Sequence, residues 1–250
     1  MKAIILAAGR GERLGGEFGA RPKALLTFGG RTLLERHLAL LGRVGVRDIV
    51  VATGFQAEQI ASELERLGAL AEGVRCVHNP AFTDGSVVTL YVTREHLVYG
   101  GAVLLMDGDV LYDRRMLDRL LRSAHPNCYL LDRNIEPGEE PMKLAVKGGR
   151  LIDFARRLDA ACDYYGESVG FFRFTAAIAA ALPGACRALI DAGRAGENHE
   201  AALRALLRDS PAGTFGFEDI TGLPWTEIDF PEDVRRANDD ILPRLIPLES

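Results

Sequence analysis

Hydrophobic residues in the first half of the chain gather in short runs rich in Ile, Val and Leu, separated by longer amphipathic stretches. Such runs are typical of strands buried on both faces of a parallel sheet, and the stretches between them are typical of crossover helices. The pattern predicts strands at residues 3–6, 48–53, 74–78 and 101–106, with helices at 32–41 and 57–67.

The second half has shorter hydrophobic runs joined by glycine and proline turns. We predict strands at 129–132, 142–146, 151–154, 168–174, 214–218 and 225–228, and helices at 176–182, 186–192, 200–207 and from Pro231 onward. The second half therefore reads as a mixed extension of the same sheet. Because the chain shows no internal repeat, low-complexity tract or linker, we expect one α/β domain over residues 1–250.

The composition and net charge of the chain limit the kinds of binding partner that we expect. The 250 residues include 30 Lys and Arg against 35 Asp and Glu, which gives a net charge of −5. A nucleic-acid partner calls for a basic face, so we expect none. The chain shows neither a signal sequence nor a long apolar run, so we expect a cytoplasmic protein without a membrane partner. The four cysteines form no CxxC pair, which argues against a zinc knuckle or a redox dithiol.

A glycine-rich loop follows the first predicted strand and leads to Lys23. Small residues let the backbone approach a ligand, and successive free N–H groups bind phosphate. Gly9, Gly11 and Gly15 give G-x-G-x-x-x-G, which differs from the dinucleotide fingerprint, and the Walker sequence is absent. The loop therefore predicts a phosphate site of another kind, with the cations of Arg13 and Lys23 beside it. The alternative is a tight turn with solvated cations.

Acidic residues stand at two places that a parallel sheet can bring together. Asp107 and Asp109 follow the fourth predicted strand, and Asp229 follows the last one. Side chains at the carboxyl ends of parallel strands face the ligand crevice. Mg²⁺ binds one or two carboxylates together with phosphate oxygens. We therefore predict a Mg²⁺ site at Asp109 and Asp229, with Glu227 as a weaker third ligand.

These motifs resemble those of the NTP-transferase, or nucleotidyltransferase-like, family. Residues 6–14 read L-A-A-G-x-G-x-R-L and residues 22–25 read P-K-x-L. Residues 225–237 read W-x-E-I-D-x-x-x-D-x-x-x-A, which is similar to bacterial cytidylyltransferases acting on phosphocholine, aminoethylphosphonate or inositol phosphate. The resemblance implies a Rossmann-like, GT-A-like fold with a mostly parallel mixed central sheet flanked by helices. It also implies a nucleotide-binding half at 1–125 and an acceptor-binding half at 126–250.

The resemblance also implies roles for individual residues. The expected catalytic residues are Arg13, Lys23, Asp109 and Asp229. The expected nucleotide-binding residues are Leu6, Ala7, Ala8, Gly9, Gly11, Arg13, Lys23, Gly85, Ser86 and Asp107. The alternative for Asp107 is a structural role in a turn. Glu232 and Asp233 are acidic residues near Asp229, and their alternative to a role in the site is a place in the first turn of a helix, where negative charge is favourable. Relatives commonly carry Asn where this chain has Ser86, which weakens the case for cytosine over uracil.

The expected acceptor-binding residues are Lys143, Arg156 and Glu167. Residues 140–143 read E-x-M-K and residues 166–170 read G-E-x-x-G, as in the same cytidylyltransferases, although Arg156 stands where lysine is usual. Lys143 and Arg156 would hold the acceptor phosphate, and Glu167 would face an amine or a hydroxyl. The alternative for each is a strand-edge charge in water.

The sequence thus predicts a Mg²⁺-dependent cytidylyltransferase. It would transfer CMP from CTP, or the monophosphate of another NTP, to a small phosphate or phosphonate monoester and release pyrophosphate, as a monomer or homodimer. One alternative is a sugar-1-phosphate uridylyl- or thymidylyltransferase. Another is a catalytically silent regulatory module, and a dinucleotide dehydrogenase is a more distant one.

Overall fold

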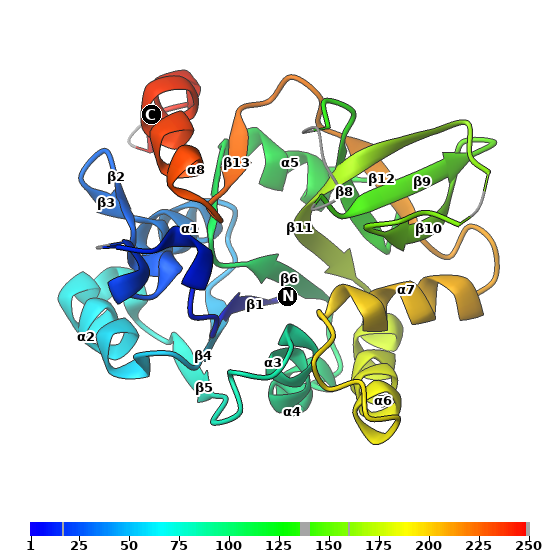
Figure 1. Cartoon of the computed structure of the whole chain (residues 1–250), viewed down its shortest axis with the longest axis horizontal. Helices are drawn as coiled ribbons and strands as arrows, with labels where there is room; N and C mark the ends of the chain where they lie inside the picture. The colour runs from blue at the N-terminus through cyan, green and yellow to red at the C-terminus, as the bar shows by residue number, and fades with distance from the viewer. Residues whose placement is uncertain (17, 136–140, 160, 249–250) are drawn as a thin grey trace.

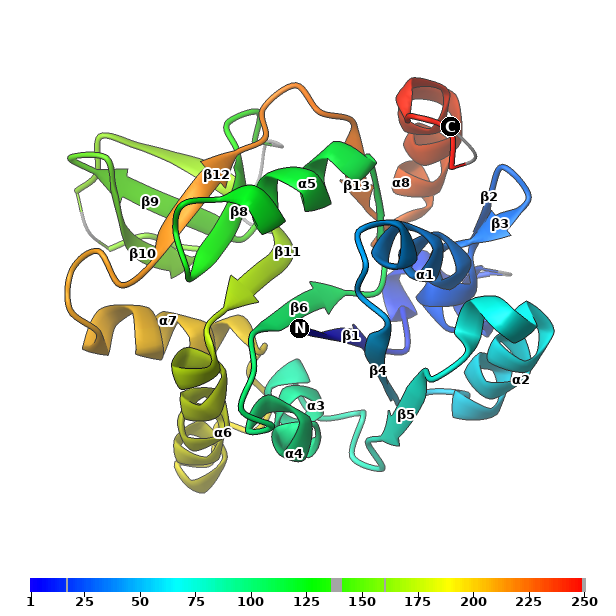
Figure 2. The ribbon, with the colours of Figure 1, turned by 180° about the vertical axis from the view of Figure 1, so that it is seen from behind.

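A mixed sheet of nine strands forms the centre of the molecule (Figures 1 and 2). The computed structural model describes residues 1–16, 18–135, 141–159 and 161–248. Seven strands follow one another across the sheet: β10 (Arg150–Ala155), β9 (Lys143–Lys147), β11 (Tyr164–Phe174), β6 (Val103–Asp107), β1 (Lys2–Ala7), β4 (Asp48–Thr53) and β5 (Arg75–His78). The other two, β8 (Cys128–Asp132) and β12 (Gly216–Asp219), pair with each other, and β8 also pairs with β11.

Strand direction divides the sheet into two parts. The strands β6, β1, β4 and β5 run parallel, whereas β11 runs antiparallel to β6 and joins the second half of the chain to the first. Antiparallel pairing then continues through β9 and β10. The carboxyl ends of β1 and β6 lie side by side, because Leu6 is in register with Asp107. This register sets the glycine loop beside the acidic turn.

Helices cover both faces of the sheet because alternate residues of the central strands point to opposite sides. Ile4 and Leu6 belong to one buried cluster and Ala3 and Ile5 to the other. On the first side pack α3 (Ser86–Val92), α4 (Arg94–Leu97), α6 (Ala176–Asp191) and α7 (Glu200–Asp209). On the second side pack α1 (Leu33–Arg43), α2 (Ala57–Leu67) and α5 (Arg114–Arg122).

A third buried cluster fixes the C-terminal segment beside the acidic turn. Strand β13 (Trp225–Glu227) pairs with β7 (Val110–Tyr112), and α8 (Pro231–Arg236) continues into a π turn and a 3-10 turn that end at Arg244. Ile228 and Val234 pack there with Phe28 of the hairpin β2 (Thr27–Phe28) and β3 (Arg31–Thr32). The Ile228 N–H donates to the Asp109 carbonyl at 3.0 Å, which brings Asp229 next to Asp109.

The structure corrects the predicted elements at several points. The helices predicted at 176–182 and 186–192 form one helix, α6, with Pro183 inside it. Its buried residues Ala179, Leu182, Cys186 and Leu189 keep one apolar face through the proline, so packing overrides the break that proline favours. Strand β5 is a mostly exposed edge strand rather than one buried on both faces. The sequence analysis did not predict α5, β7 or the β2–β3 hairpin.

Candidate active site

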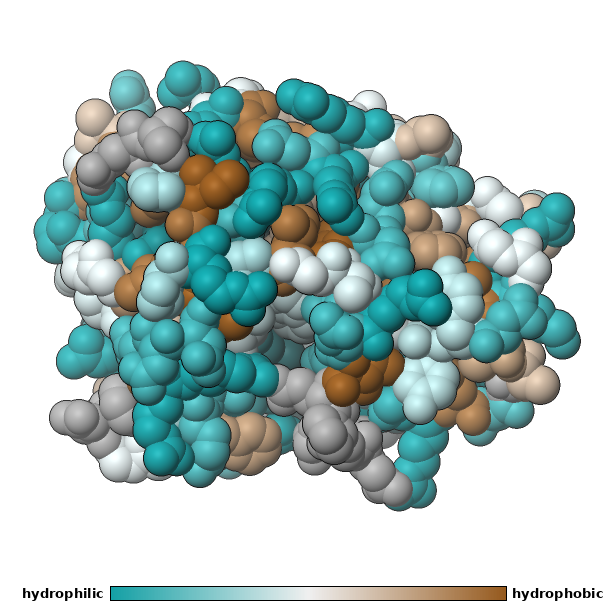
Figure 3. Space-filling view, turned by 90° about the horizontal axis from the view of Figure 1, so that it is seen from above, coloured by the Kyte–Doolittle hydropathy of each residue, from teal (hydrophilic) through white to brown (hydrophobic). Residues whose placement is uncertain are grey.

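A cleft of about 740 Å³ opens at the carboxyl ends of β1 and β6, between the two halves of the chain. Figure 3 shows a hollow near the centre of a mostly hydrophilic face. A neighbouring hollow of about 380 Å³ continues along the glycine loop. One or both are lined by Leu6, Ala7, Ala8, Gly9, Gly11, Arg13, Lys23, Ser86, Asp107, Asp109, Arg156, Glu167, Glu227 and Asp229. Of the predicted site residues, Gly85 and Lys143 do not line them.

The glycine loop turns sharply beyond β1 and passes close to Lys23. Gly11 has a φ of 62°, in the left-handed region, and its carbonyl accepts a hydrogen bond from the Leu14 N–H at 3.1 Å. A Cβ on Gly11 would lie 3.0 Å from the Lys23 Cγ. Glycine therefore serves two purposes at this position, because it permits the turn and leaves room for the lysine side chain.

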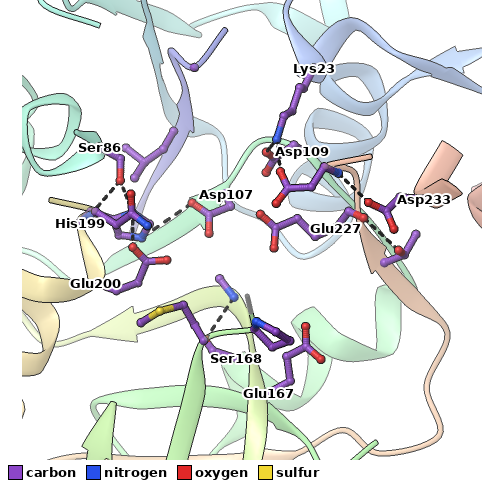
Figure 4. A pocket seen from close by; sticks show the side chains of 18 of the residues that line it. Lys23, Ser86, Asp107, Asp109, Glu167, Ser168, His199, Glu200, Glu227 and Asp233 are labelled. Atoms are coloured by element: carbon purple, nitrogen blue, oxygen red, sulfur yellow. Dashed lines mark hydrogen bonds and ion pairs between the residues drawn. The ribbon is translucent and has the colours of Figure 1, made fainter. Parts of the chain in front are cut away.

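Lys23 lies between the two predicted metal-binding aspartates (Figure 4). Its ammonium donates to Asp109 Oδ2 at 2.9 Å and also to Asp229 Oδ1, and its side chain is 15% exposed. Burial alone would lower the pKa of Lys23, but the two carboxylates outweigh it and raise that pKa above its usual value. Arg13 Nη1 lies 3.4 Å from Asp229 Oδ2. The structure thus brings the four predicted catalytic residues together.

A third carboxylate completes an oxygen-donor cluster. One oxygen atom from each of Asp109, Glu227 and Asp229 lies within 4.8 Å of the other two. Glu227 is the exposed member of this cluster and lines the cleft. Hard divalent cations such as Mg²⁺ prefer donor sets made only of oxygen. The residues present therefore fit the predicted metal, and they include Glu227, the weaker third ligand of the prediction.

The turn between Asp107 and Asp109 is held from two sides. The Gly108 N–H donates to the Leu6 carbonyl at 2.9 Å, and the Gly108 carbonyl lies 3.3 Å from Nε2 of the fully buried His37. Burial lowers the pKa of His37 to about 4, so His37 is neutral at pH 7 and donates through Nε2. Asp107 projects into the cleft, where burial, then the charges of Glu200 and Asp109, raise its pKa.

The start of α3 is covered by the loop that precedes α7. The Gly85 N–H donates to the Ala195 carbonyl at 2.9 Å, and a Cβ on Gly85 would lie 1.9 Å from the Glu197 carbonyl oxygen. Close approach of that loop explains glycine at position 85. Ser86 lines the cleft, and its Oγ accepts the His199 N–H at 2.8 Å. This contact holds His199 at the cleft, and the next residue, Glu200, lines the cleft as well.

Of the three predicted acceptor-binding residues, Glu167 and Arg156 line the cleft. Burial, followed by repulsion from Asp132 on the neighbouring strand, raises the pKa of Glu167 to about 7. Arg156 also lines the cleft, whereas the Lys143 ammonium donates to the carbonyls of Pro141 at 3.3 Å and Arg156 at 2.9 Å. Lys143 therefore holds the backbone beside the cleft. Residue 140 of the E-x-M-K motif lies outside the described residues.

Several lining residues were not assigned a functional role by the sequence analysis. Trp225 Nε1 donates to Asp132 Oδ2 at 2.7 Å, which joins β13 to β8. Asp233 accepts the N–H groups of Asp229 and Phe230 at 2.9 and 2.7 Å, so it caps α8, as its alternative role suggested. The sequence analysis assigned no role to His199 or Glu200, which also line the cleft. His199 has no second histidine at metal-ligand spacing, so the sequence did not indicate that it would lie in the cleft.

Sequence comparison finds a matching family and similar curated proteins. Residues 3–161 match the family described as MobA-like NTP transferase domain. The chain is 30% identical over 96% of its length to the bifunctional IPC transferase and DIPP synthase of Rubrobacter xylanophilus, and covers 52% of that protein. It is 28% identical over 95% of its length to the CMP-5'-(3-aminopropyl)phosphonate synthase of Streptomyces rubellomurinus, and covers 38% of it. The chain thus spans about half, or less, of the length of these curated relatives.

A solved structure shows the same fold over nearly the whole chain. The inositol-1-phosphate CTP transferase from T. maritima superimposes with a TM-score of 0.76 at 21% identity, covering 97% of this chain and 93% of that one. The predicted α/β fold with a mixed central sheet flanked by helices is confirmed. Among the described residues, no helix is both long and apolar enough to cross a membrane.

Proposed function

Because the chain belongs to the family of MobA-like NTP transferase domains, we propose that it transfers CMP from CTP to a small phosphate or phosphonate monoester and releases pyrophosphate. The enzyme class follows from the family. The choice of CTP is supported by two relatives that match about 95% of the chain: the S. rubellomurinus CMP-phosphonate synthase, and the T. maritima inositol-1-phosphate CTP transferase, which shares its fold.

The arrangement of Arg13, Lys23, Asp109 and Asp229 beside the glycine loop carries this proposal. These residues come from four separate segments and meet at one end of the cleft. The loop offers backbone N–H groups and open space to a triphosphate: a Cβ on Gly9 would have no neighbour within 4 Å. Two cations and a cluster of carboxylates are what transfer between two anionic substrates requires.

The chemistry needs alignment and charge neutralisation more than proton transfer. A phosphate monoester oxygen is already largely ionised at neutral pH, so no general base is required. That oxygen attacks the α-phosphorus, the new P–O bond forms in line with the bond to the β-phosphate, and pyrophosphate leaves with the electron pair of the broken bond. Lys23 and Arg13 stabilise the negative charge that grows on the α-phosphate and the leaving group.

The carboxylates give Lys23 its position and offer a site for a metal. Asp109, Asp229 and Glu227 would hold Mg²⁺. When bound, the metal supplies positive charge to the oxygens of the triphosphate and the acceptor. Lys23 pairs with Asp109 and Asp229, so these two carboxylates hold its ammonium at the end of the cleft where the phosphates would bind.

A uridylyl- or thymidylyltransferase acting on a sugar 1-phosphate is the second candidate. Ser86 favours it, because it lies on the cleft where relatives of the cytidylyltransferase type commonly carry Asn. The chemistry at Lys23 and Asp109 would be unchanged in this case. Only the base and the acceptor would differ.

Pyrophosphate release tests the proposal. The protein is incubated with Mg²⁺ and each of four NTPs, paired with phosphocholine, phosphoethanolamine, aminoethylphosphonate, inositol phosphate or a hexose 1-phosphate. We expect release with CTP and a small monoester, reduced at least about 100-fold in the Asp109→Asn variant. Release only with UTP or dTTP and a hexose phosphate would establish the second candidate. A protein that releases no pyrophosphate with any pair is not a transferase of this kind.

A further inference from the structure

A buried histidine faces the cleft with one ring nitrogen unused. The His199 side chain is 3% exposed, and its Nδ1 lies 3.1 Å from Ser86 Oγ. The main-chain N–H of His199 donates to the same Oγ at 2.8 Å, which fixes the residue against α3. Nε2 has no hydrogen-bond partner among the described residues, although it is buried and points toward Asp107 (Figure 4). A buried polar atom without a partner is costly, so Nε2 is suited to accept a hydrogen bond from a group that enters the cleft.

Two carboxylates lie beside this ring. Asp107 Oδ1 is 3.8 Å from Nε2, and Glu200 Oε2 is 3.3 Å from Nδ1. Glu200 Oε2 is also buried and makes no hydrogen bond within the described chain. Lys23, the lysine of the catalytic cluster, forms ion pairs with Asp109 and Asp229 rather than with Asp107 and Glu200. Two buried carboxylates next to each other are unfavourable unless a cation lies between them.

The spacing of these donor atoms indicates what kind of cation fits. One donor from each of Asp107, His199 and Glu200 lies within 4.8 Å of the others. Ligands about 2.1 Å from a metal in tetrahedral geometry would lie roughly 3.4 Å apart. Acceptors about 2.8 Å from an ammonium nitrogen would lie roughly 4.6 Å apart. The observed 3.8 Å between Nε2 and Asp107 Oδ1 lies between these two spacings, so the donor atoms admit an ammonium group as well as a metal.

We propose that Asp107, His199 and Glu200 form a subsite for a protonated primary amine on the acceptor. The acceptor is then an aminoalkyl phosphate or phosphonate, a substrate class that rests on the proposed transferase function. Asp107 is two residues from Asp109, so their Cα atoms are at most about 7 Å apart. A short alkyl chain spans that distance between a phosphate at Lys23 and Asp109 and an amine at Asp107.

A quaternary ammonium fits this subsite less well. It has no N–H group to donate, and proteins bind it with several converging aromatic faces. Phe171 and Phe172 are fully buried in the core and pack against other aromatic rings, so they are not available as such faces. The groups facing the subsite are hydrogen-bond acceptors, which select an amine that carries hydrogens.

The test compares wild-type initial rates of pyrophosphate release, at saturating CTP and Mg²⁺, for 2-aminoethylphosphonate, phosphoethanolamine, ethylphosphonate and phosphocholine. Removing the amine should lower kcat/KM about 10- to 100-fold, because it removes a hydrogen bond between charged groups. In Glu200→Gln, KM for 2-aminoethylphosphonate should rise about 10-fold, and this rise should be several times larger than any change in KM for ethylphosphonate. Glu95→Gln, an exposed residue on α4, is the matched control and should change neither.

Each outcome bears on a separate claim. Equal kcat/KM for ethylphosphonate and 2-aminoethylphosphonate, or a preference for phosphocholine, would overturn the amine subsite and leave the transferase assignment in place. An equal loss for both phosphonates in folded Glu200→Gln would also overturn it, because it would show a general structural role. No pyrophosphate release with any acceptor would refute the transferase itself. The wild-type comparison does not depend on how well a variant folds.

Discussion

Replacing Lys23 with methionine should strengthen metal binding and yet abolish turnover. The Lys23 ammonium lies 2.9 Å from Asp109 Oδ2 and contacts Asp229 as well, so it occupies the space between carboxylates that would hold a divalent cation. A unit charge and a divalent ion about 4 Å apart repel by about 2 kcal/mol even at the dielectric constant of water. Removing the ammonium should therefore lower the Kd for a divalent cation at least about 30-fold in the absence of nucleotide.

Isothermal titration calorimetry with Mn²⁺, used in place of Mg²⁺, measures this Kd. Lys23→Met should bind Mn²⁺ more tightly, and its kcat should fall about 100-fold or more because the charge on the leaving group is no longer neutralised. Lys147→Met removes the same charge at the exposed end of β9 and should change neither quantity. Unchanged or weaker Mn²⁺ binding by Lys23→Met, or turnover near the wild-type rate, would refute the reasoning.

Three further substitutions test other parts of the account. Gly9→Val should leave the melting temperature unchanged but raise KM for the NTP about 10-fold, since a Cβ there has no protein neighbour within 4 Å. Glu167 has a folded pKa of about 7 against an ordinary 4.5, so the wild type should lose about 3 kcal/mol of stability relative to Glu167→Gln as pH rises from 4 to 8, measured by urea unfolding. His37→Leu should lower stability by about 1 kcal/mol and reduce kcat, because the Gly108 carbonyl loses its donor; His37→Gln, which keeps a donor, should restore both.

The nucleotide side of the cleft could be predicted from sequence because its chemistry lies in local motifs. The glycine loop and Lys23 are close together in the chain, and Asp109 directly follows a strand that hydrophobicity identifies. The carboxyl ends of parallel strands meet at one edge, which makes the position of Asp109 predictable as well. Asp229 was predicted from its place after the last strand, with the family resemblance implying the same role, and the structure adds the reason, the Ile228 hydrogen bond to Asp109.

The acceptor side could not be predicted in the same way because it is assembled from distant segments. His199 and Glu200 reach Asp107 only because the loop before α7 packs on the start of α3. Nothing in their local sequence specifies that contact. Lys143 was expected to bind phosphate because the E-x-M-K stretch resembles that of the cytidylyltransferases, whereas its hydrogen bonds to two backbone carbonyls depend on how β9 and β10 pair. The helix α6 continues through Pro183 for a similar reason, since its packing partners are distant in sequence.

The most direct test of the central claim follows the α-phosphorus of CTP. The protein is incubated with CTP labelled at the α-phosphate, Mg²⁺ and 2-aminoethylphosphonate, and the products are separated by anion exchange. The account predicts that the label appears in a CMP-phosphonate adduct, in an amount equal to the unlabelled pyrophosphate released. Label recovered only as CDP or free CMP, with no adduct, would contradict it.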